Sequence, residues 1–320
     1  MRHQDEFGTV VDAVRAGADP EGTEPIDDFL QEYAADDTLL SFPAGTYLLP
    51  QTTLEEYDHL GISSARDEHP TFVAPSDDCS DPHARFERVS DFLLEGIDFD
   101  FQREGAGGSV GVIASGDATI RDVTVTGGCS SQISTFRVDI RDPEGTGLVE
   151  NVRMQSDQTE GWLTGIYVGK DHSGTVTFRE CDLNGFSDNG LYGSAPALDD
   201  GAGGTVHTEN GHFENNNVSN IRLGAPGSTA RGDTIVVESA PEAESVNLRG
   251  IRFRRGADQE VEDCTIRFGS SVTDSFGAIV FHADNGGARV ANSRVTMDAD
   301  SVPAVKAFYH ESDDESDQHR

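Results

Sequence analysis

The chain has 320 residues and is strongly acidic, with 58 Asp and Glu residues against 23 Lys and Arg residues and a formal net charge of −35 at pH 7. This charge argues against nonspecific binding to nucleic acid, because such binding depends on a basic surface. Residues 1–8 contain no apolar stretch or twin-arginine segment, and no apolar run approaches the ~18 residues of a membrane-spanning helix. The sequence therefore predicts neither a signal peptide nor membrane contact. We expect a cytoplasmic protein, or a secreted one if a leader is missing.

The first 50 residues are predicted to form an N-terminal cap of a strand, an amphipathic helix and a pair of strands. Thr9–Val14 is predicted to be a strand, and Thr38–Leu49 contains two short strands around a Pro-Ala-Gly turn. A helix is expected over residues 25–35, because Pro25 suits the first helical position and one helical face is apolar, at Ile26, Phe29, Leu30, Tyr33 and Ala34. We expect this helix to cover the end of the structure that follows. Residues 57–84 are interpreted as loops and insertions in early coils.

A seven-residue pattern that closes on an apolar residue recurs along the rest of the chain. Its centre is Asn, Asp or Gly in most copies, which suits a sharp bend, and its flanks alternate apolar and polar residues as strands do. The copies close every 24 to 30 residues, at Phe99, Val125, Met154, Leu183, Phe213, Val237, Ile266 and Val295. A period of this length indicates a stacked repeat structure.

A second row of short strands keeps step with the first. Its inward residues recur every 25 to 30 residues, at Ile166, Leu191, Ile221, Ile251 and Ile279. Each repeat thus contains a strand, a loop and two strands that flank a tight bend. We predict an all-β fold, a right-handed parallel β-helix of about eight coils, with the helical cap at 1–50, the coils at 51–308 and an acidic disordered tail at 309–320. A β-sandwich is the alternative, but its loops and strands would not repeat at a near-constant step.

The N-terminal region resembles a known family. Gly17–Ile26, followed by the predicted helix and by Leu40-Ser-Phe-Pro-Ala-Gly-Thr-Tyr47, is similar to the N-terminal cap of pectin-lyase-like proteins. Roughly residues 9–308 resemble haloarchaeal right-handed β-helix repeat proteins, and the near absence of lysine among the 23 cationic residues resembles proteins of halophilic archaea. The resemblance implies a carbohydrate-related role. This superfamily includes polysaccharide lyases, polygalacturonases, epimerases, tailspikes and non-catalytic members, so the fold alone does not choose among them.

In that superfamily the substrate groove usually runs along the first strand of each coil, which implies a site on the second row of strands here. Alternation directs Tyr167, Tyr192, Arg222, Arg252 and Val280 outward in one ladder. We assign catalysis to Arg252, Arg254 and His282. We assign substrate binding to Trp162, Tyr167, Lys170, Tyr192, Arg222 and Arg255. Arg222 and Arg252 should lie one strand spacing apart, so we expect a ligand carboxylate, Glu160 or Asp188 to compensate their charges.

The residues of this face favour an acidic polysaccharide, because guanidinium groups bind carboxylates and aromatic rings stack on sugars. A lyase is favoured over a glycoside hydrolase, since hydrolysis needs paired carboxylates and Asp199-Asp200 lies in a Gly- and Ala-rich loop. Alternatively, the arginines pair with Asp and Glu of neighbouring coils, and the protein is a non-catalytic glycan-binding or structural solenoid. The sequence leaves the sugar and the oligomeric state open.

The cysteines and acidic residues predict no cofactor. Cys181 and Cys264 occupy the same position in distant coils and are expected to pack as small apolar side chains, while a Cys79–Cys129 bridge is left open. No Cys or His spacing typical of a metal site occurs. Asp139, Asp142 and Asp171 flank the early coils of the predicted site and leave calcium open, although their spacing does not predict it.

The halophile resemblance generates a prediction about salt. Removing salt should lower the melting temperature, because the Debye length grows from ~3 Å at 1 M to ~10 Å at 0.1 M and 35 uncompensated negative charges then repel one another. Thermal unfolding at the two salt concentrations checks this. An unchanged melting temperature would contradict the halophile interpretation.

Overall fold

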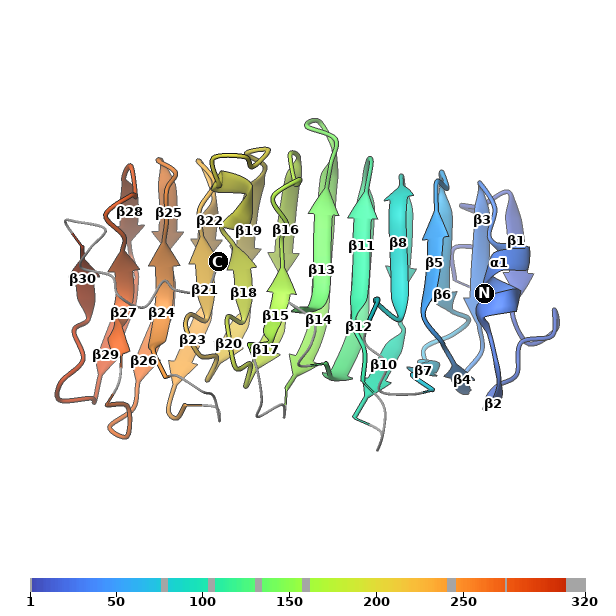
Figure 1. Cartoon of the computed structure of the whole chain (residues 1–320), viewed down its shortest axis with the longest axis horizontal. Coiled ribbons are helices and arrows are strands. Elements are labelled where there is room, and N and C mark those ends of the chain that lie inside the picture. Colours follow the sequence, from blue (N-terminus) through green and yellow to red (C-terminus); the bar gives the residue numbers. More distant parts are fainter. Residues whose placement is uncertain are drawn as a thin grey trace.

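The computed structural model describes residues 2–75, 80–102, 107–129, 134–156, 162–240, 246–273 and 275–308, whose strands stack into one elongated solenoid (Figure 1). All strand pairings in these residues are parallel, and the strands form a twenty-stranded and a ten-stranded sheet. The architecture is the predicted all-β, right-handed parallel β-helix. No helix in the described part of the chain is long and apolar enough to span a membrane.

The ten-stranded sheet contributes one strand to each coil after the first, in which a helix follows the strands of the other sheet instead. Its strands are β5 (Thr52–Glu55), β8 (Ala84–Val89), β11 (Val110–Ala114), β13 (Ser134–Ile140), β15 (Thr164–Tyr167), β18 (Leu191–Gly193), β21 (Ile221–Leu223), β24 (Leu248–Phe253), β27 (Ser275–Phe281) and β30 (Val305–Ala307). The solenoid therefore has about ten coils rather than the eight expected. The difference arises partly because the copies of the seven-residue pattern begin at Leu93, whereas residues 38–48 and 60–73 already form strands of earlier coils.

The twenty-stranded sheet contains the strands on both sides of the tight bend. Before the bend lie β1 (Thr9–Asp12), β3 (Thr38–Phe42), β6 (Leu60–Ser64), β9 (Phe92–Glu95), β16 (Thr175–Arg179), β19 (Thr205–Glu209), β22 (Thr229–Arg231), β25 (Gln259–Glu262) and β28 (Ala288–Ala291). After it lie β2 (Glu21–Pro25), β4 (Thr46–Leu48), β7 (Thr71–Val73), β10 (Asp98–Phe101), β17 (Asp182–Asn184), β20 (His212–Glu214), β23 (Thr234–Val237), β26 (Thr265–Phe268) and β29 (Arg294–Met297). Two long strands cross the bend, β12 (Ala118–Gly127) and β14 (Thr146–Gln155).

The bend predicted at the centre of the seven-residue pattern is present in seven copies as predicted. The degenerate copy bends at Gly232 and closes on Ile235, two residues before the predicted Val237, because Ile235 is in register with the closing residues of both neighbouring copies. The central residue has a positive φ of 51–70° at Gly96, Asp122, Asn151, Glu180, Asn210, Gly232, Asp263 and Asn292. Gly, Asn and Asp adopt this left-handed conformation more readily than other residues, which is why they dominate these positions. Glu180 is the exception. Its neighbours in the stack hold it in the same bend, since Glu180 N donates to Glu209 O at 2.8 Å.

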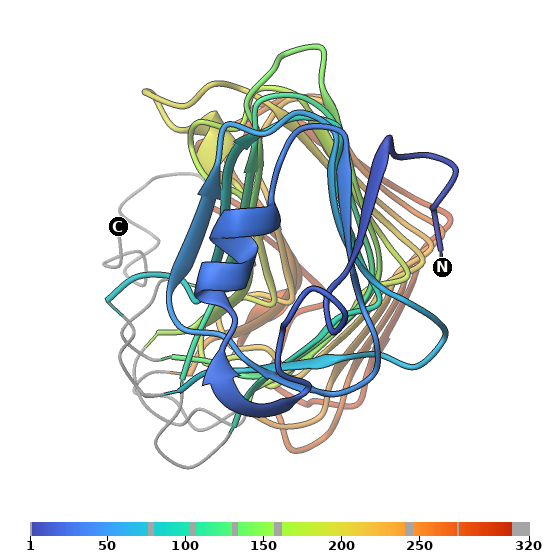
Figure 2. The ribbon, with the colours of Figure 1, turned by 90° about the vertical axis from the view of Figure 1, so that its right-hand side faces the viewer.

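The N-terminal end is covered by the short helix α1 (Asp27–Tyr33), which lies across the ring of strands (Figure 2). Phe29 and Leu30 are buried, as the amphipathic pattern predicts, and Phe29 packs edge-on against Phe42 with ring centroids 5.7 Å apart. Pro25 ends β2 instead of starting the helix. The strands before residue 50 belong to the solenoid itself, because β1 pairs with β3 and β2 with β4.

The cysteines of the repeat pattern pack in the core. Cys181 and Cys264 are buried and unpaired, as expected from their shared position in distant coils. Cys129 is disulfide-bonded, whereas Cys79 of the Cys79–Cys129 bridge left open above lies outside the described residues. The predicted tail at 309–320 also lies outside them.

A ladder of alternating charge runs along the outer face of the twenty-stranded sheet. Parallel register places seven residues in one row, in the order Glu95, Arg121, Glu150, Arg179, Glu209, Arg231 and Glu262. Arg179 illustrates the result, because it contacts Glu150 at 3.4 Å on one side and Glu209 at 2.9 Å on the other. Each charge in the middle of the row thus has opposite charges in the coils above and below it. We call this row the alternating ladder.

Reversing one charge of the alternating ladder should destabilise the solenoid. Arg179→Glu would place three carboxylates in consecutive coils, and we expect the melting temperature to fall by roughly 2–4 °C. Arg294→Glu is the matched control, because Arg294 is exposed on β29 opposite Thr265 and lies outside the ladder. Thermal unfolding of both variants at the same salt concentration measures the difference. Equal losses in the two variants would show that only net charge matters.

Candidate functional site

The outward ladder expected on the second row of strands forms in the ten-stranded sheet. Tyr167 pairs with Tyr192, Tyr192 with Arg222, Arg222 with Arg252, and Arg252 with Val280 in consecutive strands. The row continues beyond the predicted residues, to Arg137 before Tyr167 and to Lys306 after Val280. Sequence reasoning missed these two because it did not include β13 and β30 in the row. We call Arg137, Tyr167, Tyr192, Arg222 and Arg252 the site ladder.

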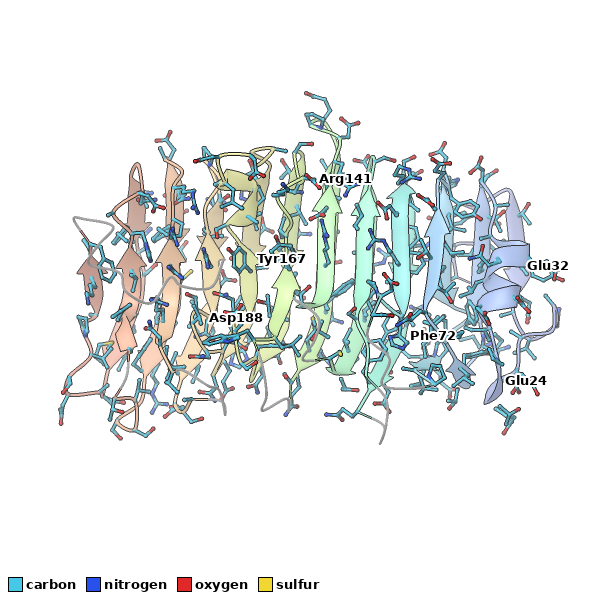
Figure 3. The ribbon with its side chains drawn as sticks, in the orientation of Figure 1. Glu24, Glu32, Phe72, Arg141, Tyr167 and Asp188 are labelled. Carbon is cyan, nitrogen blue, oxygen red and sulfur yellow. The ribbon has the colours of Figure 1, made fainter. Side chains whose placement is uncertain are left out.

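Aromatic rings and cations stack in the first half of the site ladder. The ring centroids of Tyr167 and Tyr192 are 5.4 Å apart in an edge-on arrangement, and Tyr167 is labelled on this face in Figure 3. The guanidinium carbon of Arg222 lies 4.1 Å from the ring centroid of Tyr192, and that of Arg137 lies 5.8 Å from the ring centroid of Tyr167. Cation–π contacts therefore flank the tyrosine pair on both sides. Burial raises the pKa of Tyr167, which keeps its hydroxyl protonated at neutral pH.

The arginines that were predicted to line a groove are buried, although they point away from the core. Arg222 is 5% exposed, Arg252 1% and Arg254 8%. Arg252 Nε donates a hydrogen bond of 2.7 Å to His282 Nε2. An arginine Nε–H can only donate, so His282 accepts at Nε2 and carries its ring hydrogen on Nδ1. Arg252 is thus held in place by His282, and is not the freely exposed side chain that alternation alone predicts.

Other cations predicted to line the site pair with carboxylates, as expected for a non-catalytic solenoid. Arg254 Nε lies 3.1 Å from Asp284 Oδ2, and Arg255 Nε lies 3.9 Å from the same oxygen. Lys170 is exposed and lies 2.6 Å from Asp200. The sequence did not identify Asp284, which lies only two residues beyond His282.

Trp162 is half-buried two residues before β15. Of the proposed compensating residues, Glu160 lies outside the described part of the chain, while Asp188 is described.

Asp188 is a described carboxylate whose pKa responds to the charges of Arg222 and Arg252. It lies in the turn between β17 and β18, half-buried, and is labelled in Figure 3. It accepts hydrogen bonds of 2.8 Å from Thr164 Oγ1 and from Asn189 Nδ2. Burial raises the pKa of Asp188, while the hydrogen bonds and the charges of Arg222 and Arg252 oppose that rise. The expectation that Asp188 helps to compensate the two arginines agrees with these interactions.

The Nε–H of Arg222, unlike that of Arg252, lacks a hydrogen-bond acceptor among the described residues. Its Nε is buried and has no hydrogen-bond partner among the described residues. Leaving a buried N–H unpaired costs about 1–3 kcal/mol. In the next coil lies Arg252, a like charge at a strand spacing of ~4.8 Å. The Arg222–Arg252 pair therefore has the chemistry of a site for an anion.

The described residues provide no group of three or more His, Cys, Asp or Glu side chains that could hold a metal ion. Asp139, one of the residues that left calcium open, accepts two hydrogen bonds from Arg137 at 2.8 and 2.6 Å and one from Gly169 N at 2.5 Å. These contacts make Asp139 a positioning partner of Arg137 at the start of the site ladder.

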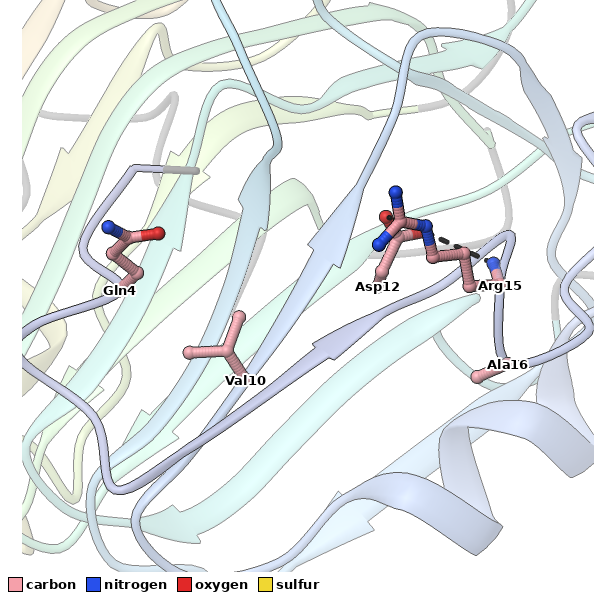
Figure 4. Close-up of a pocket in the computed structure, with 5 residues that line it drawn as sticks. All are labelled: Gln4, Val10, Asp12, Arg15 and Ala16. Carbon is pink, nitrogen blue, oxygen red and sulfur yellow. Dashed lines mark hydrogen bonds and ion pairs between the residues drawn. The ribbon is translucent and has the colours of Figure 1, made fainter.

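A surface hollow lies at the other end of the solenoid, beside β1. Gln4, Val10, Asp12, Arg15 and Ala16 line it (Figure 4). Its charged pair is Arg15 and Asp12, 3.6 Å apart, with the arginine largely exposed. None of the predicted site residues lies in this hollow, and we assign it no role.

Comparisons with known proteins show the fold. No family model and no curated protein sequence matches the chain. Among solved structures, the surface adhesin PfbA of Streptococcus pneumoniae matches with a TM-score of 0.57 and 14% identity, covering 91% of each chain. The mannuronan C-5 epimerase AlgE4 A-module of Azotobacter vinelandii matches with a TM-score of 0.52 and 12% identity, covering 93% of this chain and 97% of that one.

The catalytic domain of Agl-KA matches with a TM-score of 0.53 and 13% identity, covering 93% of this chain and 68% of that one. Sequence identities this low show a similarity of fold and nothing more. The chain thus shares its right-handed parallel β-helix fold with these proteins.

Proposed function

We propose that the protein binds an acidic polysaccharide along the site ladder and acts on it as a lyase. The observation that carries the proposal is the Arg222–Arg252 pair, two buried like charges in register beside a tyrosine pair, in a chain of net charge −35. Solved proteins of similar fold include one named a mannuronan C-5 epimerase and one named a surface adhesin. The first of these names contains a polysaccharide, mannuronan.

The charge pattern favours an acidic ligand over a neutral one. On the outer face of the other sheet, the alternating ladder gives every central charge an opposite neighbour. The site ladder instead places Arg222 next to Arg252, and repulsion in a buried setting is screened less than at the surface. A uronate carboxylate can accept charge-assisted hydrogen bonds from both guanidinium groups at once. The buried Nε of Arg222 is one donor that such a ligand would satisfy.

β-Elimination assigns a task to each reacting group. Arg222 and Arg252 neutralise the uronate carboxylate, which makes the C5 proton easier to remove. His282 takes that proton at Nε2, which becomes available once Arg252 turns from His282 to the substrate. The electron pair of the C5–H bond forms the C4–C5 double bond as the C4–O bond breaks, and the leaving oxygen takes a proton. Tyr192 carries a phenolic proton beside Arg222 and is our assignment for that donor. Arg254, held by Asp284, adds positive charge next to His282.

A non-catalytic glycan-binding solenoid is the second candidate. The ion pairs of Arg254 and Arg255 with Asp284, and of Lys170 with Asp200, favour it, because these cations already have carboxylate partners. Both candidates use the Arg222–Arg252 pair to hold an acidic ligand. They differ in whether His282 and Tyr192 react.

A panel of uronate polymers and a neutral glucan, incubated with the protein in multimolar salt, tests the proposal. We expect the ultraviolet absorbance of an unsaturated product to grow with one of the uronate polymers and not with the neutral glucan. Calorimetric titration of the same polymers measures binding. Binding without product would favour the second candidate, and the absence of both binding and product would overturn the proposal.

Arg222→Met should weaken the binding of an acidic oligosaccharide by about 10- to 100-fold, which is the loss of one or two charge-assisted hydrogen bonds. The melting temperature without ligand should not fall, because the substitution also removes the repulsion from Arg252. Arg294→Met removes one exposed positive charge outside the site and serves as the control. A lower melting temperature with undiminished binding would make Arg222 a structural residue.

A further inference from the structure

A cation at the C-terminal end of the ten-stranded sheet continues the row of the site ladder. Lys306 lies on β30 in register with Val280, which in turn pairs with Arg252. Its side chain is half-buried and points outward from the same sheet as the site ladder. Three strand steps separate Lys306 from Arg222, so the two residues are roughly 14 Å apart along the solenoid axis at ~4.8 Å per step.

Two aromatic rings hold the ammonium group of Lys306. Its Nζ lies 4.3 Å from the ring centroid of Phe276 and 4.6 Å from that of Phe308. The two rings pack edge-on against each other, with centroids 5.3 Å apart. Ring faces attract a cation through their quadrupole but do not replace a carboxylate as hydrogen-bond acceptor. An ammonium has three N–H donors, so Lys306 keeps the capacity to bind an anion.

The other lysine of the chain shows what the ordinary arrangement is. Lys170 lies 2.6 Å from Asp200, as expected in a protein with 58 acidic residues. Lys306 contacts the two phenylalanine rings instead and makes no ion pair within the described part of the chain. Arg222 resembles Lys306 in this respect, because its guanidinium carbon lies 4.1 Å from the ring centroid of Tyr192 and its Nε lacks an acceptor among the described residues.

We propose that Lys306 forms a second carboxylate subsite, and that the acidic polysaccharide lies along the solenoid axis with one uronate at Arg222 and another at Lys306. The inference rests on the proposed function and extends it to the length of the ligand. A single sugar ring does not span three strand steps, so the ligand is an oligomer that carries at least two uronates. The rings of Phe276 and Phe308 position the ammonium in advance, which reduces the conformational entropy that the lysine side chain loses on binding.

Lys306→Met tests the inference, because methionine also packs well on aromatic rings but carries no charge. Lys170→Met is the matched control, since it removes the charge of the other lysine. Lys306→Arg keeps a cation that can contact both the rings and a carboxylate. Calorimetric titration at constant salt with oligogalacturonate and oligomannuronate, each as the disaccharide and the octasaccharide, gives the affinities. Thermal unfolding without ligand checks the fold of each variant.

For the wild type, we expect the octasaccharide of at least one series to bind more tightly than the disaccharide, because only the longer chain reaches both subsites. Lys306→Met should lower the octasaccharide affinity about tenfold, the loss of one charge-assisted hydrogen bond. The affinity for the disaccharide and the melting temperature should stay unchanged in this variant. Lys306→Arg and Lys170→Met should bind the octasaccharide as the wild type does.

Three results would overturn the inference while the proposed function stands. They are a loss in Lys306→Met that is the same for both ligand lengths, equal losses in Lys306→Met and Lys170→Met, and a lower melting temperature of Lys306→Met with undiminished octasaccharide binding. If neither series binds the folded wild type at either length, the proposed function falls and the inference falls with it.

Discussion

In-register stacking of parallel coils is the constraint on which the rest of this structure depends. Every outward side chain has an equivalent neighbour one strand spacing, ~4.8 Å, above and below it. Apolar residues benefit from this arrangement, because they form continuous ladders in the core. Charged residues do not, since a repeated charge would face its own copies along the axis. A chain with 58 acidic residues must therefore control which charge occupies each outward row.

The two sheets respond to that constraint in different ways. The twenty-stranded sheet alternates Glu and Arg from Glu95 to Glu262, and each central charge contacts its opposite. The ten-stranded sheet departs from alternation at Arg222 and Arg252, and among the described residues the buried Nε of Arg222 has no hydrogen-bond partner. Proteins accept unfavourable local arrangements mainly where function requires them. The departure from a rule that the same chain follows elsewhere is thus the physical basis of the proposed site.

The bends and the register of the strands could be predicted from the sequence. The seven-residue pattern located the bends, and the row from Ile166 to Ile279 gave the correct register for Tyr167, Tyr192, Arg222 and Arg252. The alternating ladder could also have been predicted, because its residues stand at the third position of the seven-residue pattern. The alternation of charge becomes evident only when the copies are aligned. The coil count was low partly because the first coils lack the pattern.

Burial and partner choice could not be predicted from the sequence. Alternation gives the direction of a side chain but not what lies beside it, so it placed Arg252 outward without revealing that it is 1% exposed and bonded to His282. The same limit applies to Asp284, whose pairing with Arg254 depends on the path of the loop after β27. Asp188 could be named as a compensating residue, but its hydrogen bonds with Thr164 and Asn189 depend on how the coils stack, which the sequence does not reveal.

The central claim is that the Arg222–Arg252 pair is unfavourable for the fold and is kept for a ligand. A double-mutant cycle measures this directly, from the free energies of unfolding of the wild type, Arg222→Met, Arg252→Met and the double variant without ligand. A second cycle on Arg121 and Glu150, neighbours in the alternating ladder, provides the reference. We predict a repulsive coupling between Arg222 and Arg252 and an attractive one in the reference pair. An attractive or absent coupling between the two arginines would contradict the account.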